Sequence, residues 1–171
     1  MTPDEAQYYL LMFRLGEYAE YDQALDKLLE EQDPLSPLVL ELAFCMSDRR
    51  ETISVLHNFL LDHPADERKL MESKLAWVRR QYSEKAMTAV QAAEYLSRVY
   101  YVKPDLEPWW ELYDYFYDYE LYTDGCISLS VFEQCFEARL LRDEMLNPWK
   151  LQESENREKS LLGKLRDLMG K

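Results

Sequence analysis

The scarcity of glycine and the placement of proline constrain the fold of this chain most. Its 171 residues include four glycines, and its seven prolines fall between segments of helical apolar periodicity rather than within them. A β protein with many turns would need more of both residues, so the pattern favours helices joined by short connections. We predict an all-α fold: a single globular domain of about eight or nine helices packed as antiparallel helical hairpins.

Start and stop signals divide the chain into helical segments. Capping boxes, in which a hydroxyl residue precedes Glu or Gln by three positions, are predicted at Thr2 and Glu5, Thr88 and Gln91, and Ser130 and Glu133. The predicted helices cover about residues 3–16, 17–31, 36–46, 48–63, 65–83, 88–100, 108–122 and 131–146. A final amphipathic helix contains Leu161, Leu162, Leu165, Leu168 and Met169. We expect a helical domain at 1–147, with 148–171 packed on it or appended to it and partly mobile.

Acidic residues dominate the charge of the chain, which is −13 at neutral pH. The excess lies in two segments, because residues 1–33 contain nine acids and two bases, and residues 105–124 contain seven acids and no base. Such a chain is poorly suited to nucleic acid or to an anionic membrane, which attract Lys and Arg. Solubility alone would also explain the acidity.

Residues 105–124 combine this acidity with eight aromatic rings. At 100° per residue, a helix through this segment places four acids in one stripe, here named the acidic ridge: Glu107, Glu111, Asp114 and Asp118. The opposite face holds Trp109, Leu112, Tyr113 and Phe116, which we predict to be core. Tyrosines border the ridge, and rings beside carboxylates suit the binding of a basic protein. The predicted partner-binding residues are Glu111, Asp114, Tyr115, Asp118, Tyr119 and Tyr122.

Like charges three or four residues apart destabilise a helix by about 0.2 to 0.5 kcal/mol per pair, so the ridge needs compensation. Two interpretations remain open. Basic residues of the 34–104 segment neutralise the ridge within the fold, or a basic partner protein does so from outside.

No motif in the sequence specifies a reaction, a metal or a cofactor. The turn at Asp124 and Gly125 resembles the second half of an EF-hand calcium loop, but Val131 stands where the loop needs a bidentate acid. The two histidines, His57 and His63, do not follow an acid by three residues, as a di-iron helix bundle requires. Phosphate-binding glycine loops are also absent from the sequence. We therefore expect a non-catalytic protein without a cofactor.

The leading functional hypothesis is a protein that covers a basic surface of another protein. In physical character the chain is similar to the acidic helical immunity proteins that block bacterial nuclease toxins, which present carboxylates and tyrosines to a basic surface. An antitoxin is a related expectation. The alternatives are a self-associating helical scaffold and a metal-dependent hydrolase that uses scattered carboxylates. Three cysteines without metal spacing and the lack of a long apolar run predict a cytoplasmic protein with reduced thiols.

Overall fold

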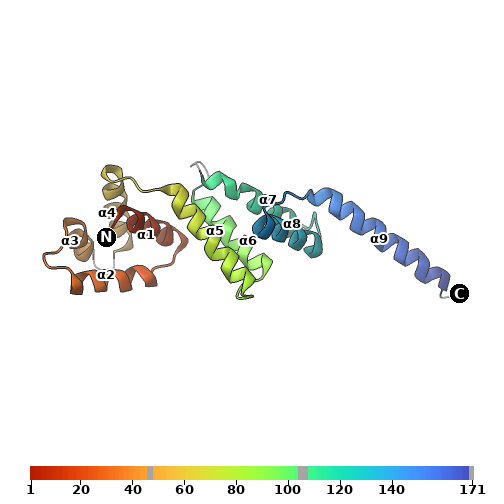
Figure 1. Cartoon of the computed structure of the whole chain (residues 1–171), viewed down its shortest axis with the longest axis horizontal. Coiled ribbons are helices and arrows are strands. Elements are labelled where there is room, and N and C mark those ends of the chain that lie inside the picture. The colour runs from red at the N-terminus through yellow and green to blue at the C-terminus, as the bar shows by residue number, and fades with distance from the viewer. Residues whose placement is uncertain (46–47, 104–107, 170–171) are drawn as a thin grey trace. The chain divides into compact units, whose positions relative to one another are not determined.

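Nine α-helices and one 3₁₀ helix form the secondary structure of the residues that this computed structural model describes (Figure 1). These residues are 1–45, 48–103 and 108–169, with side chains described up to residue 162. The predicted all-helical fold is confirmed. Within the described ranges, none of the helices combines the length and apolar character needed to cross a membrane.

The helices belong to two compact units. The first comprises Met1–Leu75 and Tyr101–Trp110, and the second comprises Ala76–Tyr100 and Glu111–Lys171. Two helices, α5 (Glu67–Ser83) and α6 (Ala89–Val102), contribute residues to both units. The boundary expected after residue 147 separates α8 from α9, and both of these helices belong to the second unit; a separate role for residues 148–171 stays a prediction.

The first unit is built on α1 (Pro3–Leu15), α2 (Ala19–Glu31), α3 (Pro37–Cys45) and α4 (Arg49–Asp62). The predicted capping box begins α1, because the Thr2 hydroxyl accepts from the Glu5 backbone and the Glu5 carboxylate accepts from the Thr2 backbone. Gly16 ends α1 with φ of 83°, a backbone conformation that favours glycine. Helix α1 packs most extensively against α4, and α3 packs against both α2 and α4.

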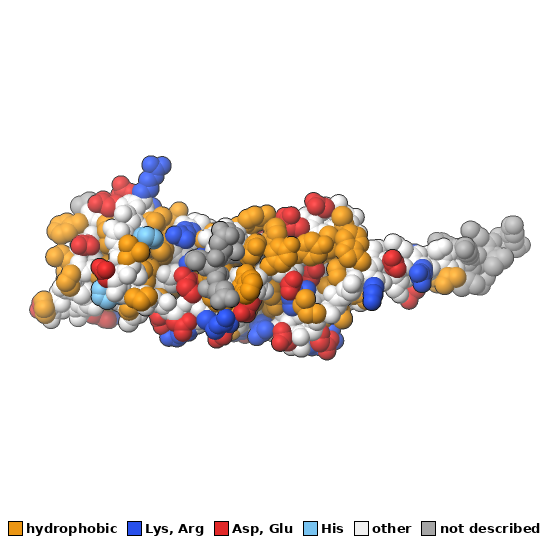
Figure 2. Space-filling model, turned by 90° about the horizontal axis from the view of Figure 1, so that it is seen from above, with side chains coloured by type: hydrophobic (Ala, Val, Ile, Leu, Met, Phe, Trp, Pro, Cys, Tyr) orange, Lys and Arg blue, Asp and Glu red, His pale blue; other side chains and the backbone are white. Residues whose placement is uncertain are grey.

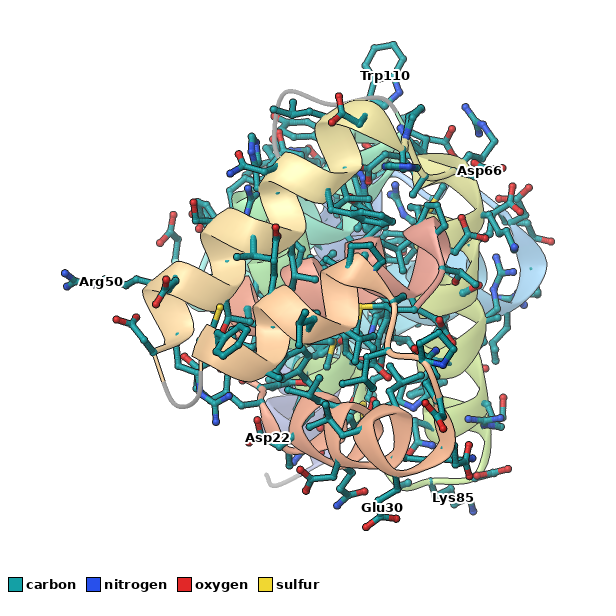
Figure 3. The ribbon with its side chains drawn as sticks, turned by 90° about the vertical axis from the view of Figure 1, so that its left-hand side faces the viewer. Asp22, Glu30, Arg50, Asp66, Lys85 and Trp110 are labelled. Carbon is teal, nitrogen blue, oxygen red and sulfur yellow. The ribbon has the colours of Figure 1, made fainter. Side chains whose placement is uncertain are left out.

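Apolar side chains from these four helices share one core: Ala6, Leu10, Phe13, Tyr21, Leu25, Leu38, Val39, Leu42 and Leu56. Tyr21 lies at its centre, with its ring centroid 4.8 Å from that of Phe13 and 5.5 Å from that of Tyr9. Charged side chains such as Glu30 and Arg50 point away from the helices (Figure 3). An amphipathic pattern on each helix therefore produces the core and the charged exterior together.

One carboxylate of the first unit joins three side chains that lie in or near its interior. Glu67, at the start of α5, accepts hydrogen bonds from Gln7 Nε2 at 2.5 Å, Lys103 Nζ at 2.7 Å and Trp109 Nε1 at 2.6 Å. Lys103 is 3% exposed and Trp109 is fully buried. The carboxylate thus compensates a buried ammonium group and satisfies a buried indole, both of which would otherwise be costly.

The second unit pairs α7 (Tyr113–Thr123) with α8 (Leu129–Arg142). Phe136 of α8 contacts Tyr82 of α5, and Phe116 of α7 stacks on Tyr100 of α6. Phe132 and Phe136 of α8 lie at the centre of its aromatic core, where Tyr115 and Tyr122 of α7 contact them. The capping box predicted at Thr88 and Gln91 begins α6. The box predicted at Ser130 is wrong, because the Ser128 hydroxyl caps α8 by accepting from the Val131 backbone.

Helix α9 (Pro148–Met169) begins earlier than the sequence pattern indicated. Its first turns are fastened to the start of α8, since Gln152 accepts from the Ser128 backbone at 2.6 Å and Glu155 accepts from the Ser128 hydroxyl. The polar stretch before Leu161 is helical, with ion pairs one turn apart at Glu153 and Arg157 and at Glu155 and Lys159. Leu161 and Leu162 are exposed, whereas the side chains of Leu165, Leu168 and Met169 lie outside the described residues.

Candidate functional site

The acidic and aromatic segment does not form the single regular helix that the sequence predicted. Trp109–Leu112 forms a 3₁₀ helix, and α7 begins only at Tyr113. A 3₁₀ helix turns about 120° per residue, so it shifts every later side chain relative to a uniform 100° projection. The buried residues of α7 are consequently Tyr115, Asp118 and Leu121. Glu107, the first member of the acidic ridge, lies outside the described residues.

Two of the predicted partner-binding residues are in the core. Tyr115 is 5% exposed and Asp118 is 3% exposed, so the prediction that both face a partner is wrong. The ring of Tyr115 contacts Phe136, with 5.8 Å between centroids, and burial raises the pKa of its hydroxyl to about 12. Asp118 is directed inward because a cation of α8 lies there.

Arg139 is that cation, and it holds two acids of the ridge. Its Nη2 donates to Asp118 Oδ2 at 3.0 Å, and its Nη1 forms an ion pair with Asp114 Oδ2 at 2.6 Å. The Asp118 side chain of this pair is 4% exposed, whereas that of Asp114 is 43% exposed. Part of the acidic ridge is therefore neutralised within the fold, as one of the two interpretations held, but by a base of residues 125–171 and not by one of the 34–104 segment.

Burial changes the titration of this cluster. Desolvation raises the pKa of Asp118 from its ordinary 3.8 to about 6, and desolvation also lowers the pKa of Arg139. Attraction to the guanidinium group of Arg139 opposes this rise in the pKa of Asp118. However, Arg139 is shared between two carboxylates, and its Nη1 contact with Asp114 lacks hydrogen-bond alignment. Near neutral pH, the two carboxylates and one guanidinium leave one net negative charge.

The other predicted residues divide between surface and partial burial. Glu111 is exposed, whereas Tyr119 and Tyr122 are half-buried, with ring centroids 6.4 Å and 5.0 Å from that of Phe132. Of the residues predicted to be core, Trp109 and Leu112 are buried and Phe116 is partly buried. Tyr113 is instead 46% exposed.

A groove opens beside the ion-pair cluster. It has a volume of about 430 Å³, and we name it the α7–α9 groove. Its lining residues come from α7, α8, the connection that follows α8 and the first turn of α9: Asp114, Tyr117, Asp118, Arg139, Met145, Leu146, Asn147, Pro148 and Trp149. Tyr117 is 39% exposed, Met145 68% and Trp149 47%. Figure 2 shows hydrophobic side chains gathered over α7 and the segment that leads into α9.

Local sequence signals shape the wall of this groove. Asp143 ends α8 with φ of 56°, where its backbone N–H donates to the Arg139 carbonyl. Asn147 then caps α9 by accepting from the Lys150 backbone at 3.1 Å, and Pro148 occupies the first helical position. The short connection between these two helix ends presents Met145, and the first turn of α9 presents Trp149, in the same groove as α7 residues.

Sequence reasoning missed Arg139, Met145 and Trp149. A signal for Arg139 exists, because it follows Phe132 by seven residues and Phe136 by three on the inward face of α8. An arginine on a buried face requires an acidic partner, so this spacing could have indicated an internal ion pair. Met145 and Trp149 carry no comparable signal, since single exposed apolar residues are common.

Metal-binding clusters and cysteine thiols are the other features that could carry chemistry. Within the described ranges, no three His, Cys, Asp or Glu side chains lie close enough together to hold a metal ion. Cys45 and Cys135 are buried free thiols, and Cys126 is an exposed free thiol. Comparison with protein-family models, curated proteins and solved structures found no match to the chain.

Proposed function

We propose that this protein is a non-catalytic binding protein that docks a basic segment of a partner protein in and around the α7–α9 groove. The observation that carries this proposal is the conjunction of Tyr117, Trp149 and Met145 with the half-exposed carboxylate of Asp114 in one groove. Tyrosine and tryptophan supply much of the binding energy at protein interfaces, and exposed methionine adapts to different partner surfaces.

The charge of the protein favours a basic partner. The described cluster at the groove has one net negative charge near neutral pH, and the whole chain has −13. Opposite charges on two proteins accelerate their encounter, by an amount that falls as salt increases. A basic toxin, covered by this protein as by an immunity protein or antitoxin, is one partner of the proposed kind.

The proposal can be tested by photo-crosslinking in the cells of origin. A photoreactive phenylalanine analogue replaces Tyr117 in one strain and the exposed Tyr18 of the first unit in another, and mass spectrometry identifies the captured proteins. We expect position 117 to capture a protein rich in Lys and Arg that position 18 does not capture. Excess wild-type protein should compete for the captured protein and reduce crosslinking at position 117. A variant with both Tyr117→Ala and Trp149→Ala should not reduce it.

Two outcomes would contradict the proposal. Identical captured proteins at positions 117 and 18 would mean that the groove has no specific partner. Capture of a second copy of this chain alone would replace the proposal with the self-associating scaffold.

A further inference from the structure

We infer that the α7–α9 groove holds the guanidinium group of one arginine side chain of the partner, stacked against Tyr117 and Trp149 and paired with Asp114. The inference rests on the proposed function and specifies the chemical group that the groove recognises. Each of the three residues offers an unused contact of the kind that a guanidinium group requires.

The carboxylate of Asp114 has one oxygen available. Its Oδ2 is occupied by Arg139, while its Oδ1 has no hydrogen-bond partner among the described residues. The side chain is 43% exposed, so a ligand in the groove can reach it. Arg139 would not serve an anionic ligand equally well, because its two terminal nitrogens already face Asp114 and Asp118. The cluster therefore selects a cation.

The two rings provide flat faces without closing the groove. Tyr117 stacks on Tyr113, with centroids 6.0 Å apart and planes inclined by 20°, which leaves its opposite face uncovered by that contact. Trp149 has no ring contact with another aromatic side chain in the described ranges, although it lines the same groove. Separate rings around one groove form the type of site that binds a cation through its π faces.

Arginine fits these surfaces better than lysine. A guanidinium group is planar, so it can stack on a ring while its edge donates to a carboxylate, whereas an ammonium group is a compact point charge. The methylene stem of the arginine would lie along Met145 and Pro148, two of the apolar residues of the lining. A groove of about 430 Å³ has room for one such side chain and some neighbouring backbone.

The inference is tested with a defined probe, N-acetyl-L-arginine amide, on the full chain at pH 7.5. Binding is followed through the Trp149 indole N–H signal in ¹⁵N NMR spectra, which the Trp149→Phe variant identifies. We expect a saturable shift at millimolar probe. N-acetyl-citrulline amide, which has the same shape without the charge, should cause no saturable shift.

Matched variants assign the contacts. Asp114→Asn should weaken probe binding about two- to fivefold, the range expected for a partly exposed ion pair. Asp124→Asn is the control, because it removes an equal charge from an exposed position outside the groove lining. Tyr117→Leu should also weaken binding about two- to fivefold through loss of the cation–π contact.

The inference fails if citrulline amide shifts the Trp149 signal as strongly as arginine amide, or if Asp124→Asn weakens binding as much as Asp114→Asn. An equal affinity for N-acetyl-lysine amide would refute the preference for guanidinium. These failures are distinguishable from failure of the proposed function, because crosslinking at position 117 could still capture a specific basic protein.

Discussion

Replacing Arg139 by methionine should destabilise the second unit strongly and in a manner that depends on pH. The substitution preserves an unbranched side chain but removes the cation paired with Asp118, which is 4% exposed at its side chain. Removing one partner of a buried ion pair costs about 3 to 5 kcal/mol, because the remaining charge stays desolvated. The simultaneous loss of the Asp114 pair should add at most about 1 kcal/mol, since that carboxylate is partly solvated.

Proton uptake provides the specific signature of this mechanism. At pH 8 the Arg139→Met variant must bury an ionised Asp118, or bind a proton against the solution pH. At pH 5 the carboxyl is protonated, so the cost should fall to that of an unsatisfied polar group, about 1 to 3 kcal/mol. Urea denaturation followed by circular dichroism measures the free energy of unfolding at both pH values. Faster hydrogen exchange at the amides of α7 and α8 than elsewhere would place the loss of stability at these two helices.

An exposed ion pair supplies the control for Arg139→Met. Arg49 donates to both oxygens of Asp22 at 2.6 and 2.7 Å, but the Asp22 side chain is 47% exposed. Asp22→Asn should therefore cost at most about 1 kcal/mol. A similarly small cost for Arg139→Met at pH 8 would show that Asp118 is solvated when Arg139 is removed, and the account of the cluster would be wrong.

Three further predictions concern buried charged groups. The carboxyl carbon signal of Asp118 should titrate near pH 6 in NMR, and a midpoint below 4 would mean that attraction to Arg139 outweighs burial. Because the pKa of Asp118 is raised in the folded state, this carboxyl favours folding below about pH 4. That contribution to stability is lost as the pH rises through 6. Glu67→Ala should lower the free energy of unfolding by about 3 kcal/mol or more, because Lys103 loses its carboxylate partner; a loss below 1 kcal/mol in urea denaturation would contradict this. Lys74→Met should raise the free energy of unfolding by about 1 kcal/mol, because the 6% exposed Lys74 ammonium has a pKa lowered by burial and, among the described residues, lies against the Met12 sulfur and the Tyr8 ring rather than a carboxylate; lower stability than wild type at pH 7 would contradict this.

The sequence was sufficient for the all-helical class and for two of the three predicted capping boxes. Thr2 with Glu5 and Thr88 with Gln91 both form the predicted boxes, because all atoms of such a box lie within four residues. The cap of α8 was less accessible, since Ser128 and Ser130 are both suitable hydroxyls. Ser128 also contacts Gln152 and Glu155 of α9, and those contacts connect residues far apart in the sequence.

The candidate site was only partly predictable for two physical reasons. The 3₁₀ helix at Trp109–Leu112 changed the phase of α7, so a projection that assumed one regular helix placed Tyr115 on the surface. Asp118 was assigned to the surface because the same projection placed it in the acidic ridge, opposite the predicted core. Its burial depends on Arg139, 21 residues later in the chain, and periodicity within α7 carries no information about that partner.

The discontinuous first unit limits how the protein can be divided by proteolysis or truncation. A fragment that ends at Leu75 would retain the helices α1 to α4 but lose Tyr101–Trp110, which belong to the same unit. Glu67 would then lack both the Lys103 and the Trp109 donors, and the space filled by the fully buried Trp109 would be open. Such a fragment should expose apolar surface and aggregate, although it contains every helix of the first unit's apolar core.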